Sequence, residues 1–221
     1  MIKIRISKIK LIPRFGMTFM LSTCLILLYS ENYYSGFFMN RNKKILILSH
    51  CILNVNAKVY GLANYEGCLS QLIEPLIKKG FGFLQLPCPE MMTCGVNRWG
   101  QVKEQYETSF FKQQYKKMLV PIINQLLDYK NNGYIINGVI GIDGSPSCGV
   151  NKTCRGDWGG EITNFLNLDE KLNSLKNVDE SGVFMEVFFK LLQKNDLKLS
   201  FFALDEENPT ASVQYILKEL L

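Results

Sequence analysis

Three cysteines each follow a stretch of sequence that predicts a buried strand. The pairs of strand and cysteine are residues 44–48 with Cys51, residues 81–86 with Cys88, and residues 134–143 with Cys148. The carboxyl ends of parallel strands meet at one edge of a sheet, and neighbouring strands lie about 4.8 Å apart. We therefore expect the three sulfurs to converge on one small object. No packing argument predicts a cysteine after each of three successive strands.

The third of these stretches, residues 138–149 (GVIGIDGSPSCG), runs from a strand into a tight polar turn. Its first half is apolar and β-branched, as in a strand covered on both faces. Gly144, Pro146 and Gly149 then break the regular backbone. Cys148 lies inside that break, near backbone N–H groups, where a thiol suits a metal or cluster ligand. The alternative interpretation is a turn of small residues with one buried cysteine.

Several metal groups bind to thiolates, and the spacing of the cysteines distinguishes between them. Structural zinc takes four nitrogen or sulfur ligands, usually with C-x₂₋₄-C spacing. The close pairs here, Cys88 with Cys94 and Cys148 with Cys154, have five residues between them, which is off the zinc pattern without excluding zinc. A cubane iron–sulfur cluster normally takes four cysteines. With three, one iron keeps an open position, as in a Lewis-acid catalyst.

A cysteine hydrolase is the less favoured interpretation, because such an enzyme needs a histidine placed as a base. The single histidine, His50, is the immediate neighbour of Cys51. Adjacent residues at a strand end point to opposite faces, so a Cys–His pair is not expected. We interpret His50 as a satisfied turn histidine.

Composition narrows the class of protein further. The 221 residues are 47% hydrophobic, which is enough for a sizeable core. The net charge of +5 comes from residues 1–44, which hold eight Lys/Arg and one acid, and the remainder is close to neutral. We therefore expect no nucleic-acid partner. Seven cysteines, an odd number, do not resemble a disulfide framework, and they favour metal or redox use in a reducing, cytoplasmic compartment.

The first 43 residues are interpreted as an N-terminal extension of a single domain at residues 44–221. Residues 1–14 are basic and residues 16–29 are mostly apolar, a run that is short for a bilayer span. The extension is a signal or anchor, a segment outside the fold, or the product of too early a start with Met39 as the natural first residue. We favour Met39, since the residues after it lead directly into a strand. No membrane contact is expected for the domain.

The order of predicted elements indicates the fold. Strands are expected at residues 44–48, 81–86, 134–143 and 198–204, and helices at residues 69–79, 103–129, 182–195 and from 209 onward. This alternation predicts an α/β fold, a Rossmann-like or flavodoxin-like parallel sheet of about four strands with helices on both faces. Pro75 should kink or split its helix, and Pro121 should bend its helix. Residues 150–181 read as a polar insertion with little periodicity.

Three motifs, residues 49–54 (SHCILN), 88–90 (CPE) and 145–149 (SPSCG), together resemble a known family. In the 2-thiouracil desulfidase family, Ser-Ala-Cys-Leu-x-Gly, Cys-Pro-Glu and Ser-Pro-Ser-Cys-Gly occur in this order with similar spacing. The resemblance covers about residues 44–204. The third motif is specific, the second is weak alone, and the ordered set is strong.

The resemblance implies a [4Fe–4S] cluster held by Cys51, Cys88 and Cys148. It implies a desulfidase that removes sulfur from a thiocarbonyl small molecule, such as a thiolated nucleobase, and releases sulfide without net redox change. Glu90 would be the general acid/base that activates water. Ser145 would assist by hydrogen bonding or proton relay.

The sequence also departs from that family. Asn54 stands where the family usually has glycine, and the family's Pro-Arg after Cys-Pro-Glu is absent, although Arg98 lies nearby. Cys94 and Cys154 are extra, and they are candidates to compete as ligands or to handle sulfide. The alternatives are a non-catalytic zinc or iron–sulfur binding module, and a sulfur-insertion enzyme that uses the same site in reverse.

Three further residues have a functional and a structural interpretation. Asp143 is a candidate second acid, although a strand-end carboxylate is more often a turn or capping residue. Trp99 and Trp158 are candidates to stack on a planar base, although aromatic residues near a pocket are more often part of the packing.

Overall fold

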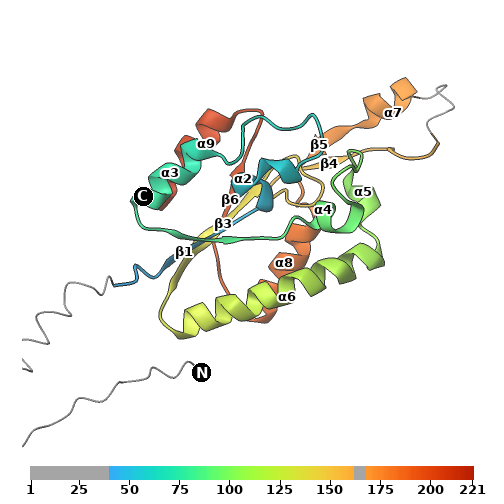
Figure 1. Cartoon of the computed structure of the whole chain (residues 1–221). Coiled ribbons are helices and arrows are strands. Elements are labelled where there is room, and N and C mark those ends of the chain that lie inside the picture. The colour runs from blue at the N-terminus through green and yellow to red at the C-terminus, as the bar shows by residue number, and fades with distance from the viewer. Residues whose placement is uncertain (1–39, 162–167) are drawn as a thin grey trace, which may run out of the picture. The chain divides into compact units, whose positions relative to one another are not determined.

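The domain is built on four parallel strands. The computed structural model describes residues 40–161 and 168–221, and Asn42–Leu221 form one compact unit. The strands are β1 (Lys44–Leu48), β2 (Gly82–Gln85), β3 (Ile135–Ile142) and β6 (Phe201–Leu204), in the order β2-β1-β3-β6 (Figure 1). The predicted α/β class and parallel sheet are confirmed. Residues 1–39, most of the expected extension, lie outside the described residues. Within the described ranges, no helix is long and apolar enough to cross a membrane.

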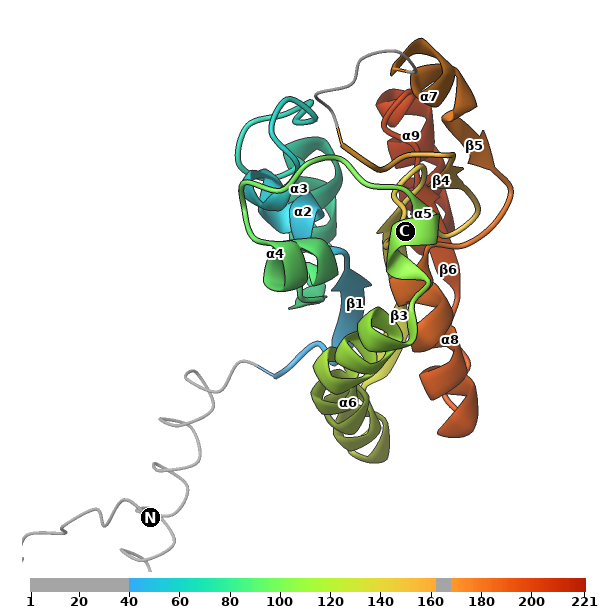
Figure 2. The same ribbon diagram turned by 90° about the vertical axis from the view of Figure 1, so that its right-hand side faces the viewer.

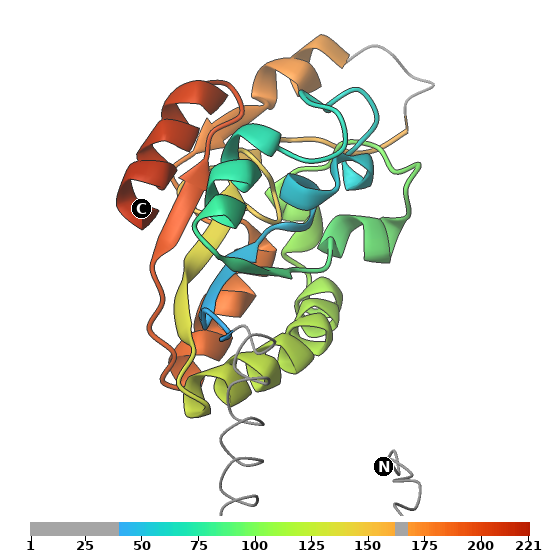
Figure 3. The same cartoon turned by 60° about the vertical axis from the view of Figure 1, so that its left-hand side comes forward.

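Helices cover both faces of this sheet, as the alternating elements predict. Helices α3 (Ser70–Lys78) and α9 (Pro209–Leu220) pack on one face, and α6 (Ser109–Asn131) and α8 (Val183–Lys194) pack on the other (Figure 3). Strand β1 faces both layers, and its residues Leu46–Leu48 are fully buried. A strand buried on both sides reads as a continuous apolar run, which is why KILIL has no polar alternation.

A glycine in β3 adjusts the register of the central strands. The pairing of β1 with β3 shifts by one residue between Ile45 and Leu46. On β3 the shift falls beside Gly138, whose φ of +147° suits glycine. A Cβ atom there would lie 2.8 Å from the Phe202 ring and 2.8 Å from the Ser200 carbonyl oxygen. Close approach of β6 therefore requires glycine at this position.

The helices differ from the prediction in two ways. The helix expected at residues 103–129 is two helices, α5 (Lys103–Tyr106) and α6, because Thr108 caps α6 by accepting a hydrogen bond from the N–H of Phe111 at 3.4 Å. Neither Pro75 nor Pro121 splits its helix, because α3 and α6 continue through them. Each proline removes one backbone hydrogen bond, and burial of the apolar face of its helix offsets that loss.

Short elements that the sequence did not predict gather at the carboxyl ends of the strands (Figure 2). The insertion contains an antiparallel pair, β4 (Thr153–Arg155) with β5 (Lys176–Val178), and helix α7 (Leu168–Ser174). Two short helices, α2 (His50–Leu53) and α4 (Pro89–Cys94), begin directly after β1 and β2, and the 3-10 turn η1 (Val55–Ala57) follows α2. Elements of three to seven residues are too short to show a periodicity.

Gly149, at the end of the SPSCG turn, has no room for a side chain. A Cβ atom would lie 2.0 Å from the Lys152 carbonyl oxygen and 2.9 Å from the Ser145 carbonyl oxygen. Both neighbours are backbone atoms, so the loop itself would have to move. We expect Gly149→Ala to lower the free energy of unfolding by about 1–3 kcal/mol in urea denaturation.

Gly100→Ala is the matched control, because Gly100 lines the same cavity and a Cβ atom there meets nothing within 4 Å. We expect it to change the free energy of unfolding by less than about 1 kcal/mol. Equal effects of the two substitutions would contradict the close approach at Gly149.

Candidate functional site

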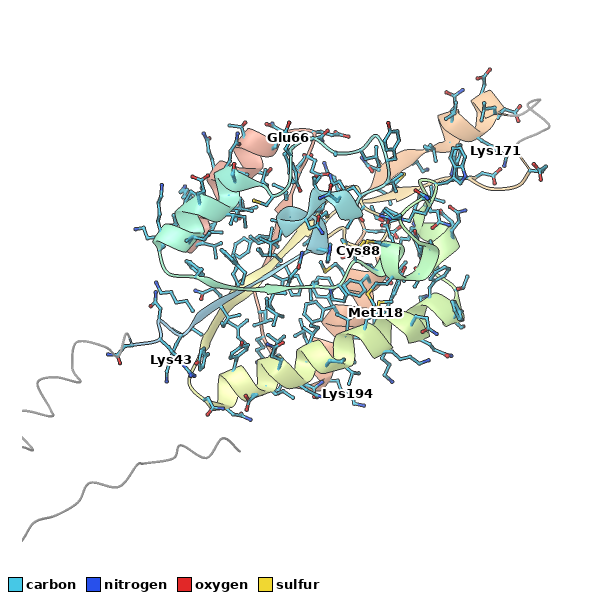
Figure 4. The ribbon with its side chains drawn as sticks, viewed as in Figure 1. Lys43, Glu66, Cys88, Met118, Lys171 and Lys194 are labelled. Carbon is cyan, nitrogen blue, oxygen red and sulfur yellow. The ribbon has the colours of Figure 1, made fainter. Side chains whose placement is uncertain are left out.

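A cavity of about 570 Å³ opens at the carboxyl ends of the strands. Its lining includes Cys51, Cys88, Cys148, Glu90, Ser145 and Ser147. The structure thus brings all five site residues predicted from the sequence to one cavity, and adds Ser147. Figure 4 labels Cys88, which lies in the interior of the domain near the start of α4.

The sheet determines where the first two cysteines lie. Beyond the last residues of the strands, the N–H of Leu86 donates to the Leu48 oxygen at 2.8 Å, so β1 and β2 end side by side. Cys51 then falls in the first turn of α2. Cys88 is the N-cap of α4, and its sulfur accepts a hydrogen bond from the N–H of Met91 at 3.4 Å.

Ser145 shapes the turn that carries Cys148. Its Oγ accepts hydrogen bonds from the N–H groups of Ser147 at 3.3 Å and Cys148 at 3.0 Å. Its carbonyl oxygen accepts from Gly149 N–H at 3.1 Å and from the Thr153 hydroxyl at 3.1 Å. These bonds fold the chain back after β3 and turn Cys148 toward the cavity, whose wall it forms.

Burial keeps the three thiols protonated when nothing is bound to them. Desolvation raises the pKa of Cys51 well above its ordinary value, and the nearby Cys148 raises it further. Burial, then the neighbouring Cys88, raises the pKa of Cys148 to about 12. Burial also raises the pKa of Cys88, although the N–H of Met91 opposes the rise. A bound metal group would have to displace these protons, so loading should release acid.

The cavity offers three thiol donors. Among the described residues, no three His, Cys, Asp or Glu side chains are arranged to hold a single metal ion. A single zinc needs its donors about 2.0–2.3 Å from one point. A cluster binds each thiolate at a separate metal atom, so its donors surround one space and need not meet at one point. Cys51, Cys88 and Cys148 all line one cavity.

The carboxylate of Glu90 is held by partners on both of its oxygens. Its Oε1 accepts a hydrogen bond from the Ser147 hydroxyl at 2.6 Å and a longer one from the Ser145 hydroxyl at 3.4 Å. Its Oε2 accepts from Nε of Arg98 at 3.2 Å and lies 3.2 Å from Nη2 of the same guanidinium. A carboxylate fixed in this way can take up or deliver a proton at the cavity wall without changing its rotamer.

Arg98 is itself anchored by the backbone. It donates to the Ala57 oxygen at 2.8 Å and to the Gly95 oxygen at 3.3 Å, and its side chain is 4% exposed. The Ala57 oxygen also lies 3.8 Å from the sulfur of Cys88. Arg98 therefore joins the turn η1, through Ala57, to the carboxylate of Glu90. The sequence placed Arg98 only near the motif, since nothing in the chain between Glu90 and Arg98 indicates the contact.

Ser147 is the other residue that sequence reasoning missed. Ser147 is 1% exposed, and its hydroxyl is nearer to Glu90 than that of Ser145. It lies within the SPSCG motif, so the motif indicated the turn from which both hydroxyl groups reach Glu90. Ser145 serves mainly as an acceptor for backbone N–H groups.

Of the three other cysteines in the described residues, one lines the cavity and two do not. Cys154 lines the cavity, on β4. Cys94 ends α4 and directs its sulfur to Gln101 Oε1 at 3.6 Å, and neither Cys94 nor Cys68 is part of the cavity lining. The six cysteines in the described part of the chain are all free thiols. Cys154 is thus the better placed of the two extra thiols to meet a bound group.

Four other candidate residues are also placed. Asp143 is a capping residue, because its Oδ1 accepts hydrogen bonds from the N–H groups of residues 150, 151 and 152 at 3.0, 2.9 and 3.3 Å. His50 donates from Nδ1 to the Leu86 oxygen at 3.2 Å, as a satisfied histidine does. Trp158 lines the cavity, with its Nε1 bonded to the Gly100 oxygen at 3.0 Å. Trp99 is 77% exposed and is not part of that lining.

An ion-pair network fastens the insertion beside the cavity. The Lys103 ammonium is buried and contacts Glu180 at 2.8 Å and Glu186 at 2.6 Å. Arg155, on β4, contacts Glu180 at 2.8 Å and Glu107 at 2.8 Å. Hydrogen bonds from Lys103, then Arg155, lower the pKa of Glu180 to about 2. The network joins α5 and α8 to the strand that carries Cys154.

Fold and site together define a parallel α/β domain with a thiol-lined cavity at the carboxyl ends of its strands. The chain is 36% identical over 160 residues to the uncharacterized protein MJ0003 of Methanocaldococcus jannaschii. The match covers 69% of this chain and 99% of that protein, so the chain belongs to the same family as the archaeal protein. No family model and no solved structure matches it. The desulfidase interpretation therefore stays a prediction.

The low pKa of Glu180 predicts a pH-dependent stability. A carboxylate whose folded-state pKa is lowered stabilises the fold above its unfolded pKa, and that contribution is lost as pH falls through the folded value. For Glu180 the loss should run from about pH 4.5 down to about pH 2. We expect the melting temperature of Glu180→Gln to lie below that of the wild type above pH 4.5, with the gap closing toward pH 2.

The control is Glu66→Gln, at an exposed carboxylate outside the cavity lining. Its melting temperature should follow that of the wild type at every pH. A constant gap between Glu180→Gln and the wild type from neutral pH to about pH 2 would contradict the ion-pair account.

Proposed function

We propose that the protein is a desulfidase that holds a [4Fe–4S] cluster on Cys51, Cys88 and Cys148. Its substrate would be a thiocarbonyl small molecule, such as a thiolated nucleobase. The observation that carries the proposal is that three thiols from three successive strands line one cavity beside a fixed carboxylate, Glu90. The overall reaction replaces sulfur by the oxygen of one water and releases hydrogen sulfide. It needs no oxidant or reductant.

The chemistry of the three thiols supports a cluster. Thiolates are the soft ligands that iron–sulfur clusters take. When bound, a cluster with three protein ligands leaves one iron with an open position, which supplies a Lewis acid toward a soft sulfur. Free thiols in the described residues agree with a reducing compartment, and we place the activity in the cytoplasm.

Glu90 is positioned to manage the protons. Attack of water on the C=S carbon requires loss of a proton from the water, and departing sulfide must gain protons. Glu90 Oε1 faces hydroxyl groups on the cavity wall, while Oε2 is held by Arg98. The guanidinium keeps the carboxylate in one orientation, so the oxygen that faces the cavity is the one that exchanges the proton.

The serine hydroxyls complete this arrangement. Ser147 and Ser145 lie 3.3 Å apart, and both reach Glu90 Oε1. Such a chain of hydroxyl groups can relay a proton between the carboxylate and a bound molecule. Ser147 also lies 3.5 Å from the sulfur of Cys148, so the same hydroxyl contacts both the carboxylate and a candidate ligand.

The first prediction of this proposal concerns cofactor binding. The full chain, purified without oxygen, should be brown and contain about four iron atoms per chain. Cys148→Ser removes one of three thiolates, so we expect iron to fall below about one atom per chain. Iron and sulfide analysis with the visible spectrum measures this directly.

Cys68→Ser is the control, because Cys68 is not part of the cavity lining, and it should keep the wild-type iron content. A full cluster in Cys148→Ser would contradict the ligand assignment. A colourless wild-type protein with one tightly bound zinc would favour the non-catalytic alternative. A requirement for a sulfur donor would favour sulfur insertion.

The second prediction separates catalysis from cofactor binding. Glu90→Gln retains the size of the side chain and removes its basicity. We expect sulfide release from 2-thiouracil to fall by about 10²–10⁴-fold while the iron content stays unchanged. Glu74→Gln, at an exposed position on α3, should retain full turnover. Unchanged turnover in Glu90→Gln would contradict its acid/base role.

A further inference from the structure

The charged residues around the cavity form an uneven set. The cations in the lining are Lys58, Arg98 and Lys152, and the acids are Glu90, Asp143, Asp205, Glu206 and Glu207. The arrangement of these charges bears on what the cavity can bind, because an anionic ligand needs a cation that is not already paired.

The two cations with buried side chains are both paired. The Arg98 side chain is 4% exposed and is bound to Glu90. The Lys58 side chain is 10% exposed and forms an ion pair with Glu206. Lys58 also donates to the Leu62 oxygen at 3.3 Å and lies over the Tyr65 ring at 5.6 Å from its centre. Of the three cations in the lining, this leaves the exposed Lys152. The remaining acids of the lining are Asp143, Asp205 and Glu207.

One carboxylate oxygen among the acids of the lining has no hydrogen-bond donor among the described residues. Glu206 Oε2 is paired with Lys58, while Glu206 Oε1 is buried and has no hydrogen-bond partner among the described residues. A buried carboxylate oxygen without a donor is costly, so such an atom favours a ligand that supplies an N–H or O–H group. Glu206 belongs to the cavity lining.

We propose that Glu206 is the residue that selects the substrate of this cavity. It accepts a hydrogen bond from a ring N–H of an uncharged heterocyclic thioamide, and the surrounding acids reject an anionic relative of the same ring. This inference rests on the proposed function and narrows its substrate class. It follows from the pairing of Lys58 with Glu206, which leaves a buried acceptor and no unpaired buried cation among the lining residues.

The test compares two ligands with the same ring, 2-thiouracil and 2-thioorotate, which adds one carboxylate. Binding to the full-length protein is measured by equilibrium dialysis at neutral pH, and sulfide release is measured in parallel. We expect wild-type protein to bind 2-thiouracil about tenfold or more tightly than 2-thioorotate. Added salt screens the repulsion between the acids and the carboxylate of 2-thioorotate. The preference for 2-thiouracil should therefore shrink as the salt concentration is raised.

Glu206→Gln should reverse the preference, because it leaves the Lys58 ammonium free to bind the added carboxylate. This single variant also leaves the Lys58 ammonium unpaired, and removing one partner of a buried ion pair destabilises a fold. A second variant therefore removes both charges. The double variant Lys58→Gln with Glu206→Gln removes both charges and should lose the affinity for 2-thiouracil without gaining affinity for 2-thioorotate. Glu219→Gln, at an exposed position outside the cavity lining, should bind both ligands as the wild type does.

The outcomes separate this inference from the proposed function. Equal binding of the two ligands by the wild type, or binding of neither, would overturn the inference. An unchanged preference in both Glu206 variants would overturn the role of Glu206. Selective binding of 2-thiouracil without sulfide release would uphold the selection and overturn the desulfidase proposal. Sulfide release at equal rates from both ligands would uphold the desulfidase proposal and overturn the selection.

Discussion

Parallel pairing of β1 with both β2 and β3 is the constraint on which the site depends. Because β1 is central, its carboxyl end fixes the position of the ends of both neighbours. The ladder continues past the strands, where the Ser49 N–H donates to the Ile140 oxygen at 2.9 Å. Cys51 and Cys88 each lie three residues beyond the end of their strand, and Cys148 lies six residues beyond the end of β3. All three can then reach a common space. Beside Gly138, the pairing of β1 with β3 shifts by one residue.

The cavity combines groups that are costly to bury, and each cost is met by a specific partner. The Glu90 carboxylate is matched by Arg98, and Lys58 is matched by Glu206. Thiols avoid the cost by staying protonated, as the raised pKa values of Cys51 and Cys148 indicate. A buried ion pair adds little net stability, and its partners keep one arrangement because separating them is expensive. Orientation of the reactive groups is therefore what these pairs contribute.

The sequence was sufficient to predict the four strands, their parallel arrangement and the edge of the sheet where the cysteines lie. Apolar runs indicate the strands, and the alternation of strands with helices indicates the parallel sheet. It did not predict α2, α4 or the β4–β5 pair, which are too short to show a period. Nor did it predict the Arg98–Glu90 pair or the network around Lys103. Those contacts depend on how loops cross in space, and a lysine that is buried reads in sequence like any surface lysine.

The division of labour between the two serines follows from the same geometry. Ser145 Oγ accepts two backbone N–H groups, so its lone pairs maintain the turn and its proton remains available to Glu90. Ser147 takes part in no such turn bond through its Oγ, which lies 2.6 Å from Glu90 Oε1 and 3.5 Å from the sulfur of Cys148. A single proton cannot serve both acceptors at once. If Cys148 becomes a metal-bound thiolate, its sulfur becomes a different hydrogen-bond acceptor for the Ser147 hydroxyl. The protonation state of Cys148 and the hydrogen bonding of the Glu90 carboxylate are then coupled through Ser147.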